Sequence, residues 1–196
     1  LRDYLHVCDN HREAKFILNS GAVLIDQRVV RKPKNPVGLM DVISLPSTKK
    51  HYRTMIDDHG RLQFVEIKAA EAQWKLLRVE NKTIVKNGKV QLNLHDGTNI
   101  ITDKKVKTGD VLQLSLPDMK VKKIIEFKEG AQAFIIGGSH VASLSEIKGI
   151  EITRSTKPNL VMYDGFQTIK PYSFVVGDKK ALVTLPEVKL WIQWEN

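Results

Sequence analysis

The residues of this chain that could do chemistry are mostly basic, and they gather near its start. Residues 10–46 combine a short helix pattern with a hairpin pattern. Their side chains that could contact phosphate are Arg12, Lys15, Asn19, Arg28, Arg31, Lys32 and Lys34. A small unit with its cations on one side and no catalytic group beside them is best explained by binding to a nucleic-acid backbone. Lys49, Lys50 and Arg53 follow closely and are further candidates for the same contact.

The element that must position the first of these side chains is a helix over residues 11–19. Asn10 can cap its start, and Glu13, three residues later, can complete a capping box. Leu18 lies on its apolar face, whereas Arg12 lies on a different face that is open to solvent or phosphate. The pattern also predicts a separate short helix over residues 1–8.

A small hairpin follows the helix and carries the next cations. Residues 22–25 form a short apolar strand, and residues 28–30 return beside it after a turn at Asp26 and Gln27. Asp26 tolerates the left-handed conformation of a tight turn, but Gln27 tolerates it less well. We therefore expect a turn that differs slightly from the usual one.

The composition limits the possible classes of protein. The chain has 196 residues and a formal net charge of +9, a length that allows one or two domains or three small modules. Residues 1–50 carry 9 cations and 5 anions, residues 51–123 carry 14 and 9, and residues 124–196 carry 8 of each. The excess positive charge that would attract a nucleic acid therefore lies in the first two-thirds of the chain, and we expect the last third to bind RNA only weakly.

The cysteine and hydropathy patterns indicate the compartment. Cys8 is the single cysteine, so an internal disulfide is excluded and a reducing cytoplasm is indicated. No signal peptide is visible, and no apolar run reaches the ~18 residues of a membrane helix. The sequence predicts no contact with a membrane.

Beyond residue 45 the pattern changes to short strands separated by turns. Strands are predicted at residues 52–56, 61–67, 82–86, 89–94, 99–102 and 111–116. Asn87-Gly88 is the strongest hairpin signal, because both turn positions need a positive φ. Residues 69–77, rich in Ala and Glu, are the one predicted helix in this part.

The last third also reads as strands, in a spacing typical of a small SH3-like barrel. They are predicted at residues 130–137, 141–153, 160–163, 172–176, 181–185 and 188–194. Phe166, Tyr172 and Trp191 or Trp194 could anchor a neighbouring protein or the central module.

An enzyme would need a constellation of reactive groups, and the sequence has none. Its six histidines are scattered without metal-ligand spacing and without a cysteine pair. Gly137-Gly138-Ser139 lacks the Lys-Ser/Thr ending of a phosphate-cradling loop. We predict no catalytic residue, no metal site and no cofactor.

Motifs along the chain also resemble a known family. The N-terminal part of the chain resembles the alpha-L RNA-binding module at Arg12, Ala14-Lys15, Asn19-Ser20-Gly21 and residues 23–26. Residues 36–43 resemble the small-subunit ribosomal protein family S-four-e of archaea and eukaryotes, and the archaeal branch fits best. The likeness continues through Asp58, Gly60-Arg61, Glu71-Ala72, Lys75-Leu76, residues 92–97, Gly137-Gly138, His140-Val141, residues 174–177 and residues 182–186.

The resemblance implies an α+β, multi-module and mostly β fold. Its parts would be an N-terminal alpha-L RNA-binding module (residues 1–46), a central β domain (residues 47–123) and a C-terminal SH3-like KOW barrel (residues 124–196). Members of the family carry a basic N-terminal extension. Because the chain begins at Leu1 rather than Met, we expect residues upstream of it.

The KOW-like segment at residues 133–145 departs from the pattern of the motif. Ala142 and Ser145 stand where the motif has glycines, and Ser139 stands where the family usually has a cation. Ala142 strains a loop that needs a positive φ, and the missing cation removes a phosphate contact. We expect the barrel to form and its RNA-binding loop to be weakened.

The function implied is that of a structural constituent of the small ribosomal subunit. Its partners would be small-subunit rRNA and neighbouring ribosomal proteins, with a monomer outside the ribosome and a cytoplasmic location. One alternative is an RNA-modifying enzyme of the pseudouridine-synthase kind, which would need a further catalytic domain. Another is a free KOW-type transcription or translation factor, which the neutral charge of the last third argues against.

Overall fold

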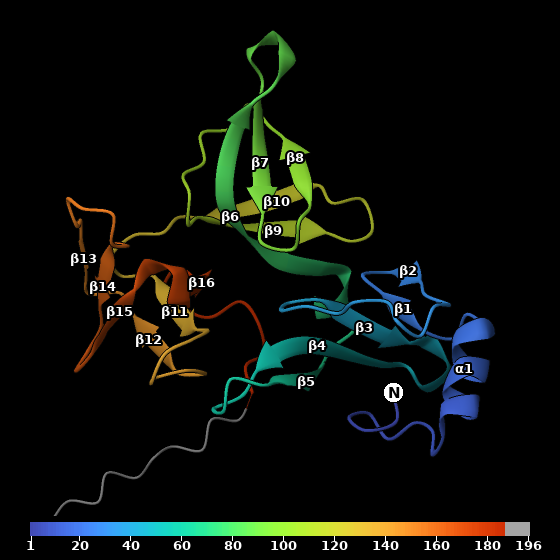
Figure 1. The fold of residues 1–196 in the computed structure, drawn as a ribbon. Coiled ribbons are helices and arrows are strands. Elements are labelled where there is room, and N and C mark those ends of the chain that lie inside the picture. Colours follow the sequence, from blue (N-terminus) through green and yellow to red (C-terminus); the bar gives the residue numbers. More distant parts are fainter. Residues whose placement is uncertain (187–196) are drawn as a thin grey trace, which may run out of the picture.

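The first sheet carries the N-terminal helix and hairpin. A computed structural model describes residues 1–186 (Figure 1). The sheet has the antiparallel order β2-β1-β3-β4-β5. Its elements are α1 (His11–Asn19), β1 (Leu24–Ile25), β2 (Arg28–Val29), β3 (Val42–Leu45), β4 (Lys50–Ile56) and β5 (Leu62–Ile67), with a 3-10 turn at Pro46–Thr48.

This sheet crosses the first predicted domain boundary. Strand β4 pairs with β3, from Val42 opposite Arg53 to Leu45 opposite Lys50. The boundary predicted between residues 46 and 47 therefore falls inside a hydrogen-bonded sheet. Turn signals alone cannot distinguish a hairpin within one sheet from a link between two modules.

The second sheet is built around the long strand β6, in the antiparallel order β10-β9-β6-β7-β8. Its strands are β6 (Trp74–Ile84), β7 (Val90–Leu94), β8 (Asn99–Ile101), β9 (Val111–Ser115) and β10 (Val121–Ile125). The first half of β6 pairs with β9 and the second half with β7, and the β6–β7 hairpin projects beyond the sheet (Figure 1). The hairpin is confirmed, with a 3-10 turn across Lys86–Gly88 in place of a two-residue turn.

The helix predicted over residues 69–77 is wrong. Only a 3-10 turn at Glu71–Gln73 occurs, and β6 begins at Trp74. The pairing of Trp74 with Ser115 and of Leu76 with Gln113 overrides the local helix propensity. Residues 1–8 contain turns instead of a helix, with His6 at φ 48 and the Val7 N–H bonded to the Leu1 carbonyl at 3.2 Å.

The last third forms two small antiparallel sheets, ordered β12-β11-β16 and β13-β14-β15. Their strands are β11 (Gln132–Ile135), β12 (Leu144–Glu146), β13 (Gly149–Glu151), β14 (Leu160–Met162), β15 (Gln167–Ile169) and β16 (Ser173–Gly177), with a 3-10 turn at Lys170–Tyr172. No strand forms at residues 181–185, and the strand predicted at residues 188–194, with Trp191 and Trp194, lies outside the described residues. Ala142 has the expected positive φ, 65°.

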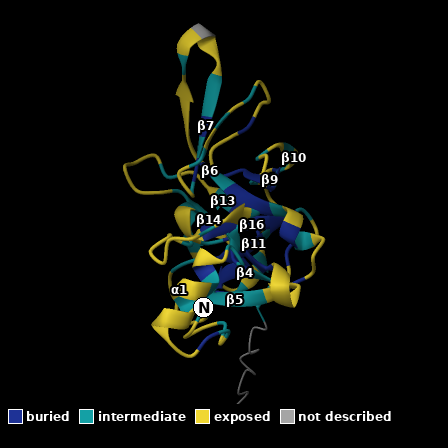
Figure 2. Ribbon diagram, turned by 90° about the vertical axis from the view of Figure 1, so that its right-hand side faces the viewer, coloured by how far each residue is buried: buried dark blue, intermediate teal, exposed yellow. Residues whose placement is uncertain are grey.

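One core is shared by all three parts of the chain. It joins Met40 and Met55 from the first sheet, Leu76 from the second and Phe134 and Phe174 from the last third. Figure 2 shows these buried segments gathered in the middle of the molecule, with the β6–β7 hairpin exposed. The predicted fold class, α+β and mostly β, is confirmed.

Helix α1 is held to its sheet by Leu18. This side chain is 8% exposed and packs in a smaller core with Val23, Ile43 and Leu45. We expect Leu18→Ala to lower the free energy of unfolding by about 2–4 kcal/mol, because it removes buried methyl groups and leaves a cavity. Urea denaturation would measure this. Phe16→Ala is the control, because Phe16 is 75% exposed and its truncation should change stability by less than about 0.5 kcal/mol.

Candidate nucleic-acid interface

Helix α1 is fixed at its start by the predicted Asn10 cap, and Glu13 reaches back to Asp9 rather than to the Asn10 N–H. The Asn10 Oδ1 atom accepts the Glu13 N–H at 2.9 Å, and the Asp9 N–H donates to Glu13 Oε2 at 3.0 Å. With the apolar face turned to the sheet, Arg12 and Lys15 are exposed. The helix therefore presents its cations to solvent in a fixed direction.

The β1–β2 turn is tighter than expected. Both Asp26 (φ 50°) and Gln27 (φ 64°) adopt the left-handed conformation, so the expectation that Gln27 would change the turn is wrong. Contacts with other elements offset the strain. The Val42 N–H donates to Asp26 Oδ1 at 3.0 Å, and the Gln27 side-chain amide donates to the Ala72 carbonyl at 3.0 Å.

Nine of the ten predicted contact residues are on the surface. They are Arg12, Lys15, Asn19, Arg28, Arg31, Lys32, Lys34, Lys49 and Lys50. Arg28 Nη2 donates to the Pro117 carbonyl at 3.3 Å, and within residues 1–186 none of these cations has a carboxylate oxygen within 4.0 Å. We call this set the basic face.

The basic face draws on α1, the β1–β2 hairpin and the β3–β4 turn, which lie at the same end of the molecule (Figure 1), and on residues 31–34, which follow the hairpin. Arg31 reaches back to the end of α1, where a Cβ added at Gly21 would lie 3.9 Å from its Nη2 atom. Gly21 has φ 74°, a left-handed conformation that favours glycine, and an added Cβ would also lie only 3.3 Å from Val29 Cγ1. Lys49 and Lys50 follow the short turn after β3.

Arg53 does not belong to the basic face, and its prediction as an RNA contact is wrong. It is fully buried on β4, in a run of three consecutive buried residues, so both faces of the strand are covered here. Its Nη2 atom donates to the Glu71 and Trp74 carbonyls at 3.0 and 3.1 Å, and its guanidinium lies 4.9 Å from the centre of the Trp74 ring. Burial lowers the pKa of Arg53 to about 10. Its role is to fix the 3-10 turn before β6.

Sequence reasoning missed Phe16. This aromatic side chain is 75% exposed on α1, between Arg12 and Lys15 on one side and Asn19 on the other. The signal was available, because a phenylalanine off the apolar face of a short helix has no partner in its own module.

The second missed residue is Lys75, which ties the basic face to the second sheet. Its ammonium lies 2.6 Å from Asp26 Oδ2, 3.0 Å from Asp41 Oδ1 and 3.0 Å from Asp96 Oδ2, and its side chain is 3% exposed. Asp26 comes from the β1–β2 turn, Asp41 directly precedes β3, and Asp96 comes from the β7–β8 turn. We call these four residues the Lys75 cluster.

The titration of the Lys75 cluster reflects burial and mutual attraction. Burial raises the pKa of Asp26. Burial opposes ionisation of Asp96 too, but the Thr98 N–H and the Lys75 ammonium hold its pKa below the ordinary value. Burial acts to lower the pKa of Lys75, and the three carboxylates together raise it above the usual range. The ammonium is therefore charged at every physiological pH.

His95 and Arg78 connect the second sheet to the other two parts. His95 Nδ1 accepts the Arg78 N–H at 3.1 Å, which leaves Nε2 to donate to the Leu39 carbonyl at 3.3 Å. Burial lowers the pKa of His95, so the ring is neutral. Arg78 Nη1 donates to the carbonyls of Pro171 (2.7 Å) and Ser173 (3.3 Å). The three parts are joined by hydrogen bonds as well as by the shared core.

Within residues 1–186, no group of three or more His, Cys, Asp or Glu side chains is placed to hold a metal ion. The helices described there are also too short or too polar to cross a membrane.

An exposed set of unpaired cations on a mostly β framework is typical of nucleic-acid-binding proteins. The family model described as "Ribosomal family S4e" matches residues 48–121. The chain is 42% identical over 191 residues to the small ribosomal subunit protein eS4 of Methanothermobacter thermautotrophicus, covering 95% of this chain and 79% of that protein. It is 44% identical to the eS4 protein of Methanosphaera stadtmanae, covering 94% and 78%.

A solved structure agrees with these relatives. The crystal structure of the 30S ribosomal protein S4e from Thermoplasma acidophilum superposes with a TM-score of 0.82 at 41% identity, covering 93% of this chain and 94% of that one. The chain belongs to the S4e family of ribosomal proteins. The predicted function, a structural constituent of the small ribosomal subunit in the cytoplasm, is confirmed, and the enzyme alternative is not supported.

Proposed function

We propose that the chain binds small-subunit rRNA chiefly through the basic face. The observation that carries this proposal is the exposure of the eight cations of the basic face, without a carboxylate partner in the described part of the chain. Unpaired cations are free to replace the counterions of a phosphate backbone. Asn19 adds an amide that can bond to phosphate or sugar.

The binding is driven by charge and shape. Side chains cannot read the narrow major groove of A-form RNA, so the cations contact phosphates and sugars across the minor groove. Phe16 stands among them and can stack on an unpaired base or cover a ribose. The Lys75 cluster and the contact of Gln27 with Ala72 hold the hairpin against the second sheet, so little ordering of the hairpin is needed on binding.

We further propose that the chain is a monomer outside the ribosome and that it is organised in three modules. The shared core and the hydrogen bonds of Arg78 and His95 are satisfied within one chain, which supports a monomer. The hydrogen-bonded sheets support a first module that extends to residue 67, followed by a central module and a C-terminal module.

The affinity for rRNA should fall steeply with salt. If about five phosphates are neutralised, log K should fall against log salt with a slope near −3.5 to −4.5. Filter binding of the full chain to small-subunit rRNA between 50 and 300 mM (roughly the range in which counterion release is measured) would give the slope. An affinity that stays flat over this range would contradict the proposal.

A further inference from the structure

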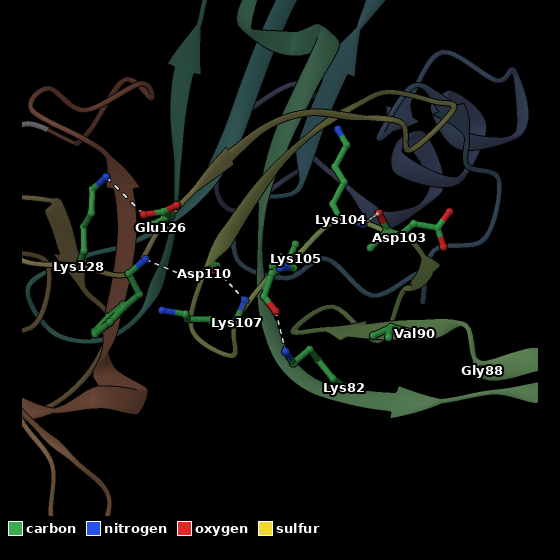
Figure 3. Close-up of a pocket in the computed structure, with 13 residues that line it drawn as sticks. Lys82, Gly88, Val90, Asp103, Lys104, Lys105, Lys107, Asp110, Glu126 and Lys128 are labelled. Atoms are coloured by element: carbon green, nitrogen blue, oxygen red, sulfur yellow. Dashed lines mark hydrogen bonds and ion pairs between the residues drawn. The ribbon is translucent and has the colours of Figure 1, made fainter.

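A second cluster of cations surrounds a cavity between the central sheet and the last third of the chain. The cavity has a volume of about 570 Å³ and is lined by Lys82, Lys104, Lys105, Lys107, Phe127 and Lys128 (Figure 3). A second cavity of 360 Å³ shares Lys82, Lys107 and Phe127 with it and continues to Ile152 and Lys170. We call the two together the inter-module cleft. From the sequence alone, Lys104 and Lys105 look like solvated strand ends.

Two of the cations are held in place by the backbone of the loop over residues 102–110. Lys82 Nζ donates to the Val106 carbonyl at 2.7 Å, and Lys170 Nζ donates to the Thr108 carbonyl at 2.8 Å. Lys170 also lies 5.1 Å from the centre of the Phe127 ring. These ammonium groups come from two modules and converge on one loop, so the positive charge of the cleft is preorganised.

Three acidic residues, Asp103, Asp110 and Glu126, line the first cavity together with its five lysines. Asp110 is buried, and its two carboxylate oxygens accept the N–H groups of Lys107 and Phe127 at 2.7 and 2.9 Å (Figure 3). Its charge is therefore used to fix the backbone at the base of the loop. Within residues 1–186, Lys104, Lys105 and Lys107 have no carboxylate oxygen within 4.0 Å, and only Lys128 is paired, with Glu126 at 3.4 Å.

The cleft also has an apolar side. Phe127 is half-buried in its wall, where it packs against the shared core and beneath the Lys170 ammonium, and Ile152 is 75% exposed at its edge. A concave site that combines lysines with an aromatic ring and an aliphatic side chain matches the two parts of an unpaired nucleotide, a phosphate and a flat base. A duplex presents its phosphates on a broad convex surface and keeps its bases stacked, so it cannot use such a cavity.

We infer that the inter-module cleft binds an unpaired segment of rRNA, with phosphates on the lysines of the 102–110 loop and a base against Phe127 and Ile152. This inference rests on the proposed function, because it assigns a second contact to the same rRNA. It adds single-stranded RNA to the duplex surface offered by the basic face. It also gives the last third of the chain, neutral overall, a part in RNA binding through Lys128 and Lys170.

The test uses the full chain and two RNA probes, a fluorescent ten-nucleotide oligouridine and a twelve-base-pair A-form duplex. The cleft variant is Lys104→Gln with Lys105→Gln and Lys107→Gln. The matched control is Lys68→Gln with Lys120→Gln and Lys122→Gln, three exposed lysines outside the cleft, so that both variants lose the same charge. We expect the cleft variant to bind oligouridine about tenfold more weakly and the control about twofold more weakly, with duplex affinity equal in the two variants.

A crosslink gives a second measurement that does not depend on charge. Oligouridine that contains 4-thiouridine should crosslink to the peptide around Phe127 in the unmodified chain, and Phe127→Leu should reduce the yield. Equal oligouridine affinity in the cleft and control variants would overturn the inference, as would tighter binding of an acidic peptide than of oligouridine at this site. Loss of duplex binding on changing the basic face is a separate result, so failure of the cleft and failure of the proposed function can be told apart.

Discussion

Replacing Lys75 with methionine should lower the free energy of unfolding by about 3–5 kcal/mol at pH 7, the cost of leaving buried carboxylates without their counter-charge. Lys75 is the only cation within 4.0 Å of Asp26, Asp41 and Asp96 in the described part of the chain. Methionine keeps the length of the apolar stem, so the loss reports the charge more than the packing. Urea denaturation followed by tryptophan fluorescence measures it.

The pH dependence of this loss has a definite sign. Without the ammonium, burial raises the pKa of Asp26 further and Asp96 loses a main opposing influence, so both folded-state pKa values rise. A group with a raised folded pKa contributes stability that is present at low pH and lost as the pH rises. The variant should therefore recover part of its deficit at pH 5. A deficit that is the same at pH 5 and pH 7 would show that Lys75 acts through packing.

The control for this prediction is Lys68→Met, which removes an exposed lysine directly after β5. Its effect should stay within about 0.5 kcal/mol, because solvent screens exposed charges. A large effect at Lys68 would mean that net charge, and not the Lys75 cluster, controls stability.

The triple replacement of Arg12, Lys15 and Arg31 by alanine should weaken binding to small-subunit rRNA by about 100-fold at moderate salt. The slope of log K against log salt should become less steep by about 3, because three phosphate contacts are lost. All three side chains are exposed, so the melting temperature should change little. Filter binding over a salt series and a thermal melt of the same preparation measure the two effects.

A second triple variant removes the same amount of positive charge but leaves the basic face intact. Lys68, Lys120 and Lys122 are exposed and lie outside both the basic face and the cleft. Their replacement by alanine should leave most of the rRNA affinity in place. If the two triple variants bind equally well, the basic face is not the main contact, whereas the S4e membership of the chain is unaffected.

Local rules were sufficient for the elements that carry the basic face. The Asn10 cap, the apolar face of α1 and the left-handed Gly21 all follow from residues within one or two turns of each other, and the structure contains them. The exposure of Arg12 and Lys15 follows from the same helix. Short-range patterns determine these features because no distant segment competes for the same residues.

Long-range pairing explains what the sequence did not predict. Residues 69–77 favour a helix locally, but β9, about forty residues away, takes their hydrogen bonds. Gln27 is unfavourable in a tight turn by local rules, but its side-chain amide gains a hydrogen bond to the Ala72 carbonyl. In the sequence Arg53 cannot be told from a surface cation, and its burial depends on Glu71 and Trp74, whose carbonyls accept its hydrogen bonds. In each case the deciding partner lies in another segment, and a single sequence does not show the pairing.

The shared core has a consequence for the chain while it is being made. The strands of the first sheet end at Ile67, so this sheet can pair early in synthesis, but the core that buries Met40 and Met55 is complete only with Val176 and Val183. At about 5–20 residues per second, more than 100 residues take roughly 6–25 s to follow. For that time the nascent chain exposes an apolar sheet face. New chains should therefore be held by ribosome-associated chaperones until residue 183 has emerged.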